Sequence, residues 1–141
     1  MWNMLWPLLM VVCANTFYHV CAKSTPEAID PFASLTVTYL VGALCSLVLF
    51  FVTSAEHKLG AELAKVNWTT LVLGVAIVGL EYGFLSMYRA GWKVSVAQLA
   101  ECTVLSVVLI FVGALLYRES ISLRQVAGVV VCAAGLFLIM K

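Results

Sequence analysis

Two carboxylates lie deep inside apolar segments of this chain of 141 residues. Glu81 stands eight residues before Arg89, and Glu101 stands seven residues after Val94. At 1.5 Å per helical residue, both carboxylates lie roughly 10–12 Å from the same end of their segments. An ionisable side chain at membrane depth costs a few kcal/mol or more and is a functional candidate by default. Glu81 and Glu101 therefore predict a shared site, on consecutive antiparallel helices, that exchanges a proton or binds a substrate.

Polar and aromatic residues accompany each carboxylate. Gln98 lies one turn before Glu101 and is its expected hydrogen-bond partner. Tyr88 recurs at helical spacing from Glu81, and Tyr82 follows it directly. We count Gln98, Tyr82 and Tyr88 as candidate substrate-binding residues. The alternative is structural: the aromatic rings only pack, and each carboxylate bonds a helix backbone or a neighbouring hydroxyl.

A third group of candidates lies in the first apolar segment. Asn15, Tyr18 and His19 share one helical face, and Lys23 is one turn beyond them. Because His19 lies near the same end as the Arg89 loop, it is expected to line the mouth of the same cavity. The alternative for His19 is an ordinary surface histidine near the membrane interface.

Other kinds of chemistry find no support in the residue pattern. The chain has no C-x-x-C pair, its two histidines stand apart, and neither H-E-x-x-H nor G-x-S-x-G occurs. We therefore expect no metal, no cofactor and no enzyme. The net charge of +1 gives no reason to expect a nucleic-acid partner. The five cysteines are read as small apolar fillers: Cys13, Cys21, Cys45, Cys102 and Cys132.

Composition shows which elements must position these residues. Hydrophobic residues make up 64% and charged residues 11% of the chain, against about 45–50% and 25% in soluble domains. Lipid must therefore be the solvent, and only helices can cross it as an open chain. The prediction is a single all-α transmembrane domain over residues 1–141. Its five helices are expected at about 4–22, 32–53, 68–88, 94–117 and 122–140.

The loops carry recognisable start and stop signals. Pro31 suits the first turn of the second helix. Lys58 and Glu62 are four residues apart, which favours a short surface helix between the second and third spans. Ser122 with Gln125 fits a capping box that opens the last helix. The first segment lacks the basic start of a signal peptide and is expected to remain as a helix.

Basic residues are balanced between the two sides of the membrane. An odd number of spans puts the termini on opposite sides of the membrane. When the loops are assigned alternately to the two sides, each side has four Lys or Arg residues. On the N-terminal side these are Lys58, Lys65, Arg118 and Arg124, and on the other side Lys23, Arg89, Lys93 and Lys141. The positive-inside rule then selects no orientation. Insertion in both orientations and a single orientation set by other features both stay open.

The C-terminal run resembles a known family. From Gly113 the chain reads GALLYRESISLRQVAGVVVCAAGLFLIMK, which is similar to the end of an EamA domain of the drug/metabolite transporter superfamily. Shared features are an apolar helix, Glu119, a short cap and a last helix with Gly128 and Gly135. The small multidrug resistance proteins show the same glycine spacing. Small residues on one face let helices approach closely, either within the chain or as a seam between two copies.

The resemblance covers essentially the whole chain, since an EamA domain is about this long and has five helices. It implies a secondary transporter, and the carboxylates at membrane depth add the expectation of proton coupling. The carboxylates and aromatic residues favour a small organic amine or drug as solute, and Lys23 and Arg89 leave amino acids and other metabolites open. Most members carry two such domains as an inverted repeat, so one domain implies an antiparallel homodimer. The implied setting is multi-pass, in the inner or plasma membrane of a bacterium, with lipid, solute and protons as partners.

Two departures from the family pattern limit how much of the family's mechanism can be assigned to this chain. The fourth span lacks the proline that many EamA domains carry, and the first span offers Asn15 and His19 where the small multidrug resistance proteins use a glutamate. Their cation/proton mechanism is therefore not carried over directly. Three other functions stay open: a non-transporting membrane subunit, half of a heterodimeric transporter, and a flippase for lipid-linked sugars.

Insertion in both orientations, one of the two open alternatives, gives a testable prediction. Two reporters fused in turn to the C-terminus, one active only in the cytoplasm and one only outside it, should both give a signal. A signal from one reporter alone would contradict dual topology.

Overall fold

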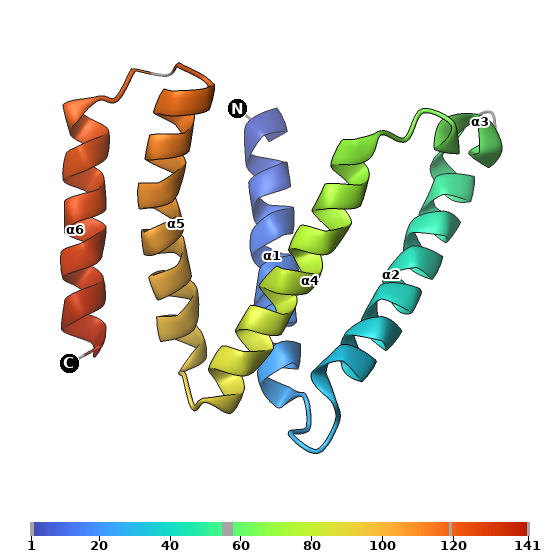
Figure 1. Ribbon diagram of the computed structural model, residues 1–141, viewed down its shortest axis with the longest axis horizontal. Helices are drawn as coiled ribbons and strands as arrows, with labels where there is room; N and C mark the ends of the chain where they lie inside the picture. Colours follow the sequence, from blue (N-terminus) through green and yellow to red (C-terminus); the bar gives the residue numbers. More distant parts are fainter. Residues whose placement is uncertain (1, 55–57, 119, 141) are drawn as a thin grey trace. The chain divides into compact units, whose positions relative to one another are not determined.

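The computed structural model describes residues 2–54, 58–118 and 120–140, and within these ranges it contains helices and no strand. Five helices are long and apolar enough to cross a membrane, which confirms the predicted fold class and its five spans (Figure 1). The surface helix expected between the second and third spans is also present, as α3. The elements are α1 (Trp2–Ser24), α2 (Pro31–Thr53), α3 (Leu59–Leu63), α4 (Trp68–Arg89), α5 (Val94–Leu116) and α6 (Leu123–Met140).

Local capping explains where two of the spans begin. Asp30 accepts a hydrogen bond from the backbone N–H of Ala33 at 3.0 Å, and Pro31 occupies the first turn of α2. At α6, Ser122 Oγ accepts from the N–H of Arg124 at 3.1 Å. In return the N–H of Ser122 donates to Gln125 Oε1 at 2.8 Å. The capping box predicted from Ser122 and Gln125 is therefore confirmed.

The chain divides into two compact units, which are described separately. The α5–α6 unit joins the residues up to Val20 with those from Ala90 onward, and in it α5 packs along α6. The α2–α4 unit comprises Cys21–Arg89, and in it α2 packs against α4. Because α3 and its flanking loops connect α2 to α4, these two helices run antiparallel (Figure 1).

Two basic side chains close one end of the α2–α4 unit. Arg89 Nη2 donates to the carbonyl oxygen of Ile29 at 2.6 Å and lies 3.4 Å from that of Pro26. Lys23 Nζ donates to the Tyr88 carbonyl at 3.1 Å and lies 5.7 Å from the centre of the Tyr88 ring. Carbonyls at the end of a helix lack intrahelical partners. Lys23 and Arg89 supply hydrogen-bond donors to such backbone carbonyls and to those of the loop. Lys23 and Arg89 hold the first loop against the end of α4.

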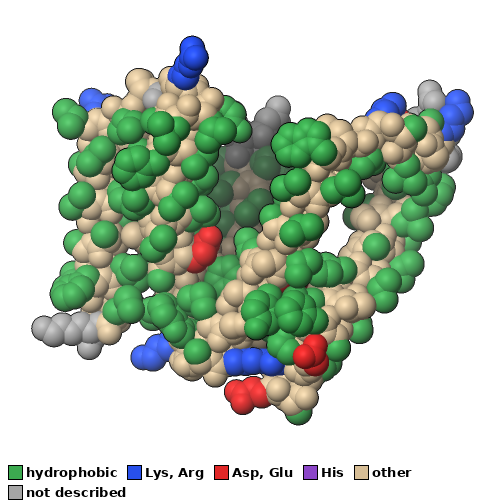
Figure 2. Space-filling view, in the orientation of Figure 1, with side chains coloured by type: hydrophobic (Ala, Val, Ile, Leu, Met, Phe, Trp, Pro, Cys, Tyr) green, Lys and Arg blue, Asp and Glu red, His purple; other side chains and the backbone are tan. Residues whose placement is uncertain are grey.

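Most apolar side chains point outward rather than into a core. Leu115 is 80% exposed and Leu138 is 75% exposed, and hydrophobic side chains cover much of the face shown in Figure 2. Such surfaces would be costly in water but are compatible with lipid. The few buried apolar residues include Leu35, Phe84 and Leu85. The helices are therefore built to face hydrocarbon.

The clamp formed by Arg89 predicts a measurable loss of stability. Arg89→Met keeps most of the aliphatic stem but removes both contacts to the first loop. Because hydrogen bonds to charged groups contribute about 1.5–3 kcal/mol and this one is partly exposed, we expect the free energy of unfolding in detergent to fall by about 1–2 kcal/mol. Lys93→Met is the matched control, since Lys93 is exposed and makes no capping bond. Equal stability of the two variants would contradict the clamp.

Candidate functional site

Glu81 meets a tyrosine from the neighbouring helix. It is half-buried on α4, and its carboxylate interacts with the hydroxyl of Tyr39 on α2. The Tyr39 hydroxyl oxygen is buried and makes no hydrogen bond of ordinary geometry within the described residues. The contact with Glu81 is therefore a loose one. The phenol remains able to donate its proton to the carboxylate or to a ligand bound there.

Other aromatic rings lie on the same two helices as this carboxylate. The rings of Phe32 and Tyr82 stack at a centroid distance of 4.8 Å, with 8° between their planes. Tyr82 is still 41% exposed, so part of its surface is open to a ligand. Tyr88 is only 4% exposed and stacks on Phe84 at 6.2 Å. Of the two predicted tyrosines, Tyr82 is thus accessible, whereas Tyr88 packs inside the α2–α4 unit.

The sequence reasoning missed Tyr39, although a signal for it exists. Tyr39 is eight residues after Pro31, where α2 begins, and Glu81 is eight residues before Arg89, where α4 ends. Two antiparallel helices put such positions at equal depth. The hydroxyls of Thr36 and other α2 residues return to carbonyls of their own helix, for example at 2.8 Å to Phe32. Tyr39 is too long to do this and reaches the next helix instead.

A second polar site lies within the α5–α6 unit. A groove of about 480 Å³ opens between α1 and α5, and we call it the α1–α5 groove. It brings together Asn15, His19 and Gln98, three of the residues predicted to bind substrate. Tyr18 does not line it, but its ring meets that of His19 edge-on at 5.0 Å. The groove is lined by Val12, Asn15, Thr16, His19, Val20, Val94, Ser95, Gln98, Leu99 and Cys102.

Two expectations about these residues are corrected. His19 is only 4% exposed, so it is not the surface histidine of the alternative reading. Gln98 was expected to bond Glu101, but its Nε2 donates to the Cys102 sulfur at 3.0 Å. Both partners lie within one turn of Gln98, and the side chain follows the groove face, where Cys102 lies. Glu101 is half-buried beside the Cys102 thiol and does not line the groove.

The two carboxylates belong to different units, Glu81 to the α2–α4 unit and Glu101 to the α5–α6 unit. Their pairing in one shared site therefore stays a prediction.

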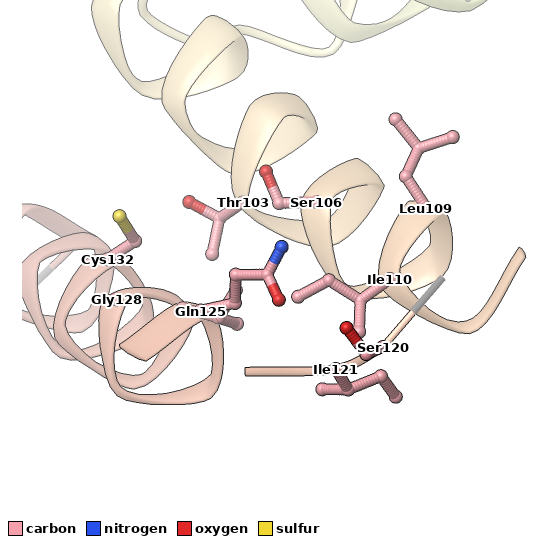
Figure 3. A pocket seen from close by; sticks show the side chains of 10 residues that line it. Thr103, Ser106, Leu109, Ile110, Ser120, Ile121, Gln125, Gly128 and Cys132 are labelled. Atoms are coloured by element: carbon pink, nitrogen blue, oxygen red, sulfur yellow. The ribbon is translucent and has the colours of Figure 1, made fainter. Parts of the chain in front are cut away.

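A second groove in the α5–α6 unit, of about 430 Å³, separates α5 from α6 and includes Gly128 (Figure 3). Figure 3 shows the amide of Gln125 pointing toward the α5 hydroxyls of Thr103 and Ser106. These hydroxyls donate to their own helix, Thr103 to Leu99 O at 2.7 Å and Ser106 to Cys102 O at 2.6 Å.

Neither glycine of α6 marks a close approach of helices within the chain. A Cβ atom added at Gly128 or Gly135 would meet no atom within 4 Å among the described residues. Of the two predicted roles, packing inside the chain is therefore not what the structure shows. The seam between copies stays a prediction. Glu119, the acidic residue of the same motif, lies outside the described residues.

The described part of the chain contains no group of three His, Cys, Asp or Glu residues able to hold a metal ion. All five cysteines are free and exposed.

Comparison with known proteins gives one match. The model of the EamA-like transporter family matches residues 1–141. No curated protein and no solved structure matches the chain.

Proposed function

The chain belongs to the EamA-like transporter family of the drug/metabolite transporter superfamily, and on that premise we propose a proton-coupled secondary transporter. It is a multi-pass membrane protein, and its proposed solutes are small organic amines, drugs or related metabolites. The proposed location is a bacterial inner or plasma membrane.

The observation that carries the proposal is the carboxylate of Glu81 inside a candidate membrane span, beside the Tyr39 hydroxyl of the neighbouring helix. A carboxylate there is costly unless a proton or an organic cation neutralises it. Because one negative charge needs one neutralising partner, proton and cation compete for Glu81. The Tyr39 hydroxyl can steady the ionised form between partners. The stacked rings of Phe32 and Tyr82 offer an aromatic face to a cation.

Because the proton and the solute compete for Glu81, the proton gradient is coupled to the solute gradient. A proton that binds on the acidic side releases the solute, and a solute that binds on the other side releases the proton. Lys23 and Arg89 already serve backbone carbonyls, which favours a cationic solute over an anionic one.

The functional unit is proposed to be an antiparallel homodimer. One repeat with five spans is half of the usual inverted pair, and its basic residues divide four against four. Gly128 and Gly135 have open space beside them, which leaves room for a helix of a second copy. Alternating access would then be an exchange of shape between the two protomers.

Glu81→Gln tests the coupling role. In proteoliposomes, a screen of amines and metabolites with and without a pH gradient identifies the solutes that the parent protein moves. Glu81→Gln should abolish the part of their uptake that the gradient drives, because an amide exchanges no proton. Glu62→Gln is the control, since Glu62 lies on the exposed α3 and pairs with Lys65 at 2.6 Å. Gradient-driven uptake that survives Glu81→Gln would refute the role.

Tyr39→Phe refines the same test. Tyr39→Phe removes the hydroxyl that can donate to Glu81 or to a bound ligand, and a donor worth about 1 kcal/mol should change the parent rate roughly fivefold, lowering it. In the Glu81→Gln background it should have no further effect on gradient-driven uptake.

The proposed seam predicts a change in assembly without a change in fold. Gly135→Leu should lower the dimer fraction in detergent, measured by light scattering after size exclusion, because the added side chain blocks close approach. The monomer should keep its helicity and thermal stability, since the site is open within the chain. Ala133→Leu, at an exposed position of the same helix, is the matched control. An unchanged dimer fraction in Gly135→Leu would argue against the seam.

A further inference from the structure

The α1–α5 groove has a mostly apolar surface with a few polar groups and no acidic residue, lysine or arginine. Among its ten lining residues there is no Asp, Glu, Lys or Arg. Six of the ten carry a polar side-chain atom: Asn15, Thr16, His19, Ser95, Gln98 and Cys102.

The groove contains a buried hydrogen-bond acceptor that the protein does not use. Gln98 Oε1 is buried and has no hydrogen-bond partner within the described residues. The other end of the amide is already committed, since Nε2 donates to Cys102 Sγ at 3.0 Å. Thr16 donates its only hydroxyl proton to Val12 O at 2.7 Å. Toward a ligand, Thr16 therefore offers only lone pairs.

These facts limit what the groove can bind. A buried acceptor without a donor costs about 1–3 kcal/mol, so a group with an N–H or O–H is favoured. A charged group would meet no oppositely charged residue among those that line the groove. An apolar group would leave Gln98 Oε1 unsatisfied. The best ligand is thus uncharged and carries hydrogen-bond donors, as a carboxamide or a hydroxyl does.

We propose that the α1–α5 groove is a binding site for the uncharged, N–H- or O–H-donating part of the transported solute, recognised by the carbonyl oxygen of Gln98. Its role in transport rests on the proposed function, but binding itself does not require Glu81.

The groove between α5 and α6 provides an internal comparison. There Gln125 Oε1 accepts the N–H of Ser122 at 2.8 Å. In the described part of the chain, no buried side-chain acceptor of that groove is left without a partner. It is of similar size and also contains a cysteine, Cys132. It should therefore show no preference for donor groups.

Cysteine labelling tests the proposal directly. Cys102 lines the α1–α5 groove and is exposed, so it can report occupancy once the other four cysteines are replaced by alanine. The protein in lipid nanodiscs is treated with N-ethylmaleimide in the presence of four probes of similar size. Two are uncharged donors, benzamide and benzyl alcohol; methyl benzoate has no donor; benzylamine is cationic.

Benzamide and benzyl alcohol should slow labelling of Cys102 about threefold at twice their dissociation constant. Methyl benzoate and benzylamine, at equal concentration, should leave the rate unchanged. Equal protection by the ester, stronger protection by the amine, or no protection by either donor would overturn the proposal. A protein that keeps only Cys132 should show no difference among the probes; selective protection there by the donors would also overturn it.

Two variants locate the effect. Gln98→Leu should remove the advantage of benzamide over the ester, with each rate compared to that of the same variant without probe. Persistence of the advantage would overturn the role of Gln98, and the probe series on the parent tests the groove even if this variant does not fold. Glu81→Gln should keep the protection of Cys102 while losing transport. Failure of the proposed function is thereby distinguished from failure of the groove.

Discussion

Hydrocarbon offers no hydrogen-bond partner, so polar groups in the membrane-spanning helices must find their partners within the protein. Many serine and threonine hydroxyl groups in the spans donate to a carbonyl of their own helix, as Ser86 does to Tyr82 O at 2.8 Å and Thr103 to Leu99 O at 2.7 Å. Arg89 at a helix end serves loop carbonyls instead. Among the described residues, few buried side-chain polar atoms lack a hydrogen-bond partner. The Tyr39 hydroxyl beside Glu81 and the carbonyl oxygen of Gln98 are among them, and they are where a ligand gains most.

Features set by local sequence could be predicted, and features set by helix pairing could not. The five spans follow from length and hydropathy, and the cap formed by Ser122 and Gln125 follows from residues three apart. The shared face of Asn15 and His19 follows from helical periodicity. The partner of Gln98 was predicted wrongly, because Glu101 and Cys102 are both within one turn and local spacing does not choose between them. The pairing of Tyr39 with Glu81 could be predicted only with the knowledge that α2 packs against α4.

The two units carry different chemistry. The α2–α4 unit contributes a carboxylate with aromatic neighbours, suited to a charge that must be neutralised. The α5–α6 unit contributes a groove that no Asp, Glu, Lys or Arg lines, suited to a neutral group that donates hydrogen bonds. A change in one unit should therefore alter the coupling to protons, and a change in the other should alter the choice of solute. This separation offers a physical basis for altering selectivity without losing coupling.

The central claim is that one chain is half of a transporter and that each half contributes its Glu81. Parent and Glu81→Gln chains carrying different affinity tags can be co-expressed in varied ratios and reconstituted together. Gradient-driven uptake is then measured against the fraction of parent chains. If both protomers must supply Glu81, uptake should fall as the square of that fraction. A linear fall would show that each Glu81 works independently of a second copy and would contradict the account.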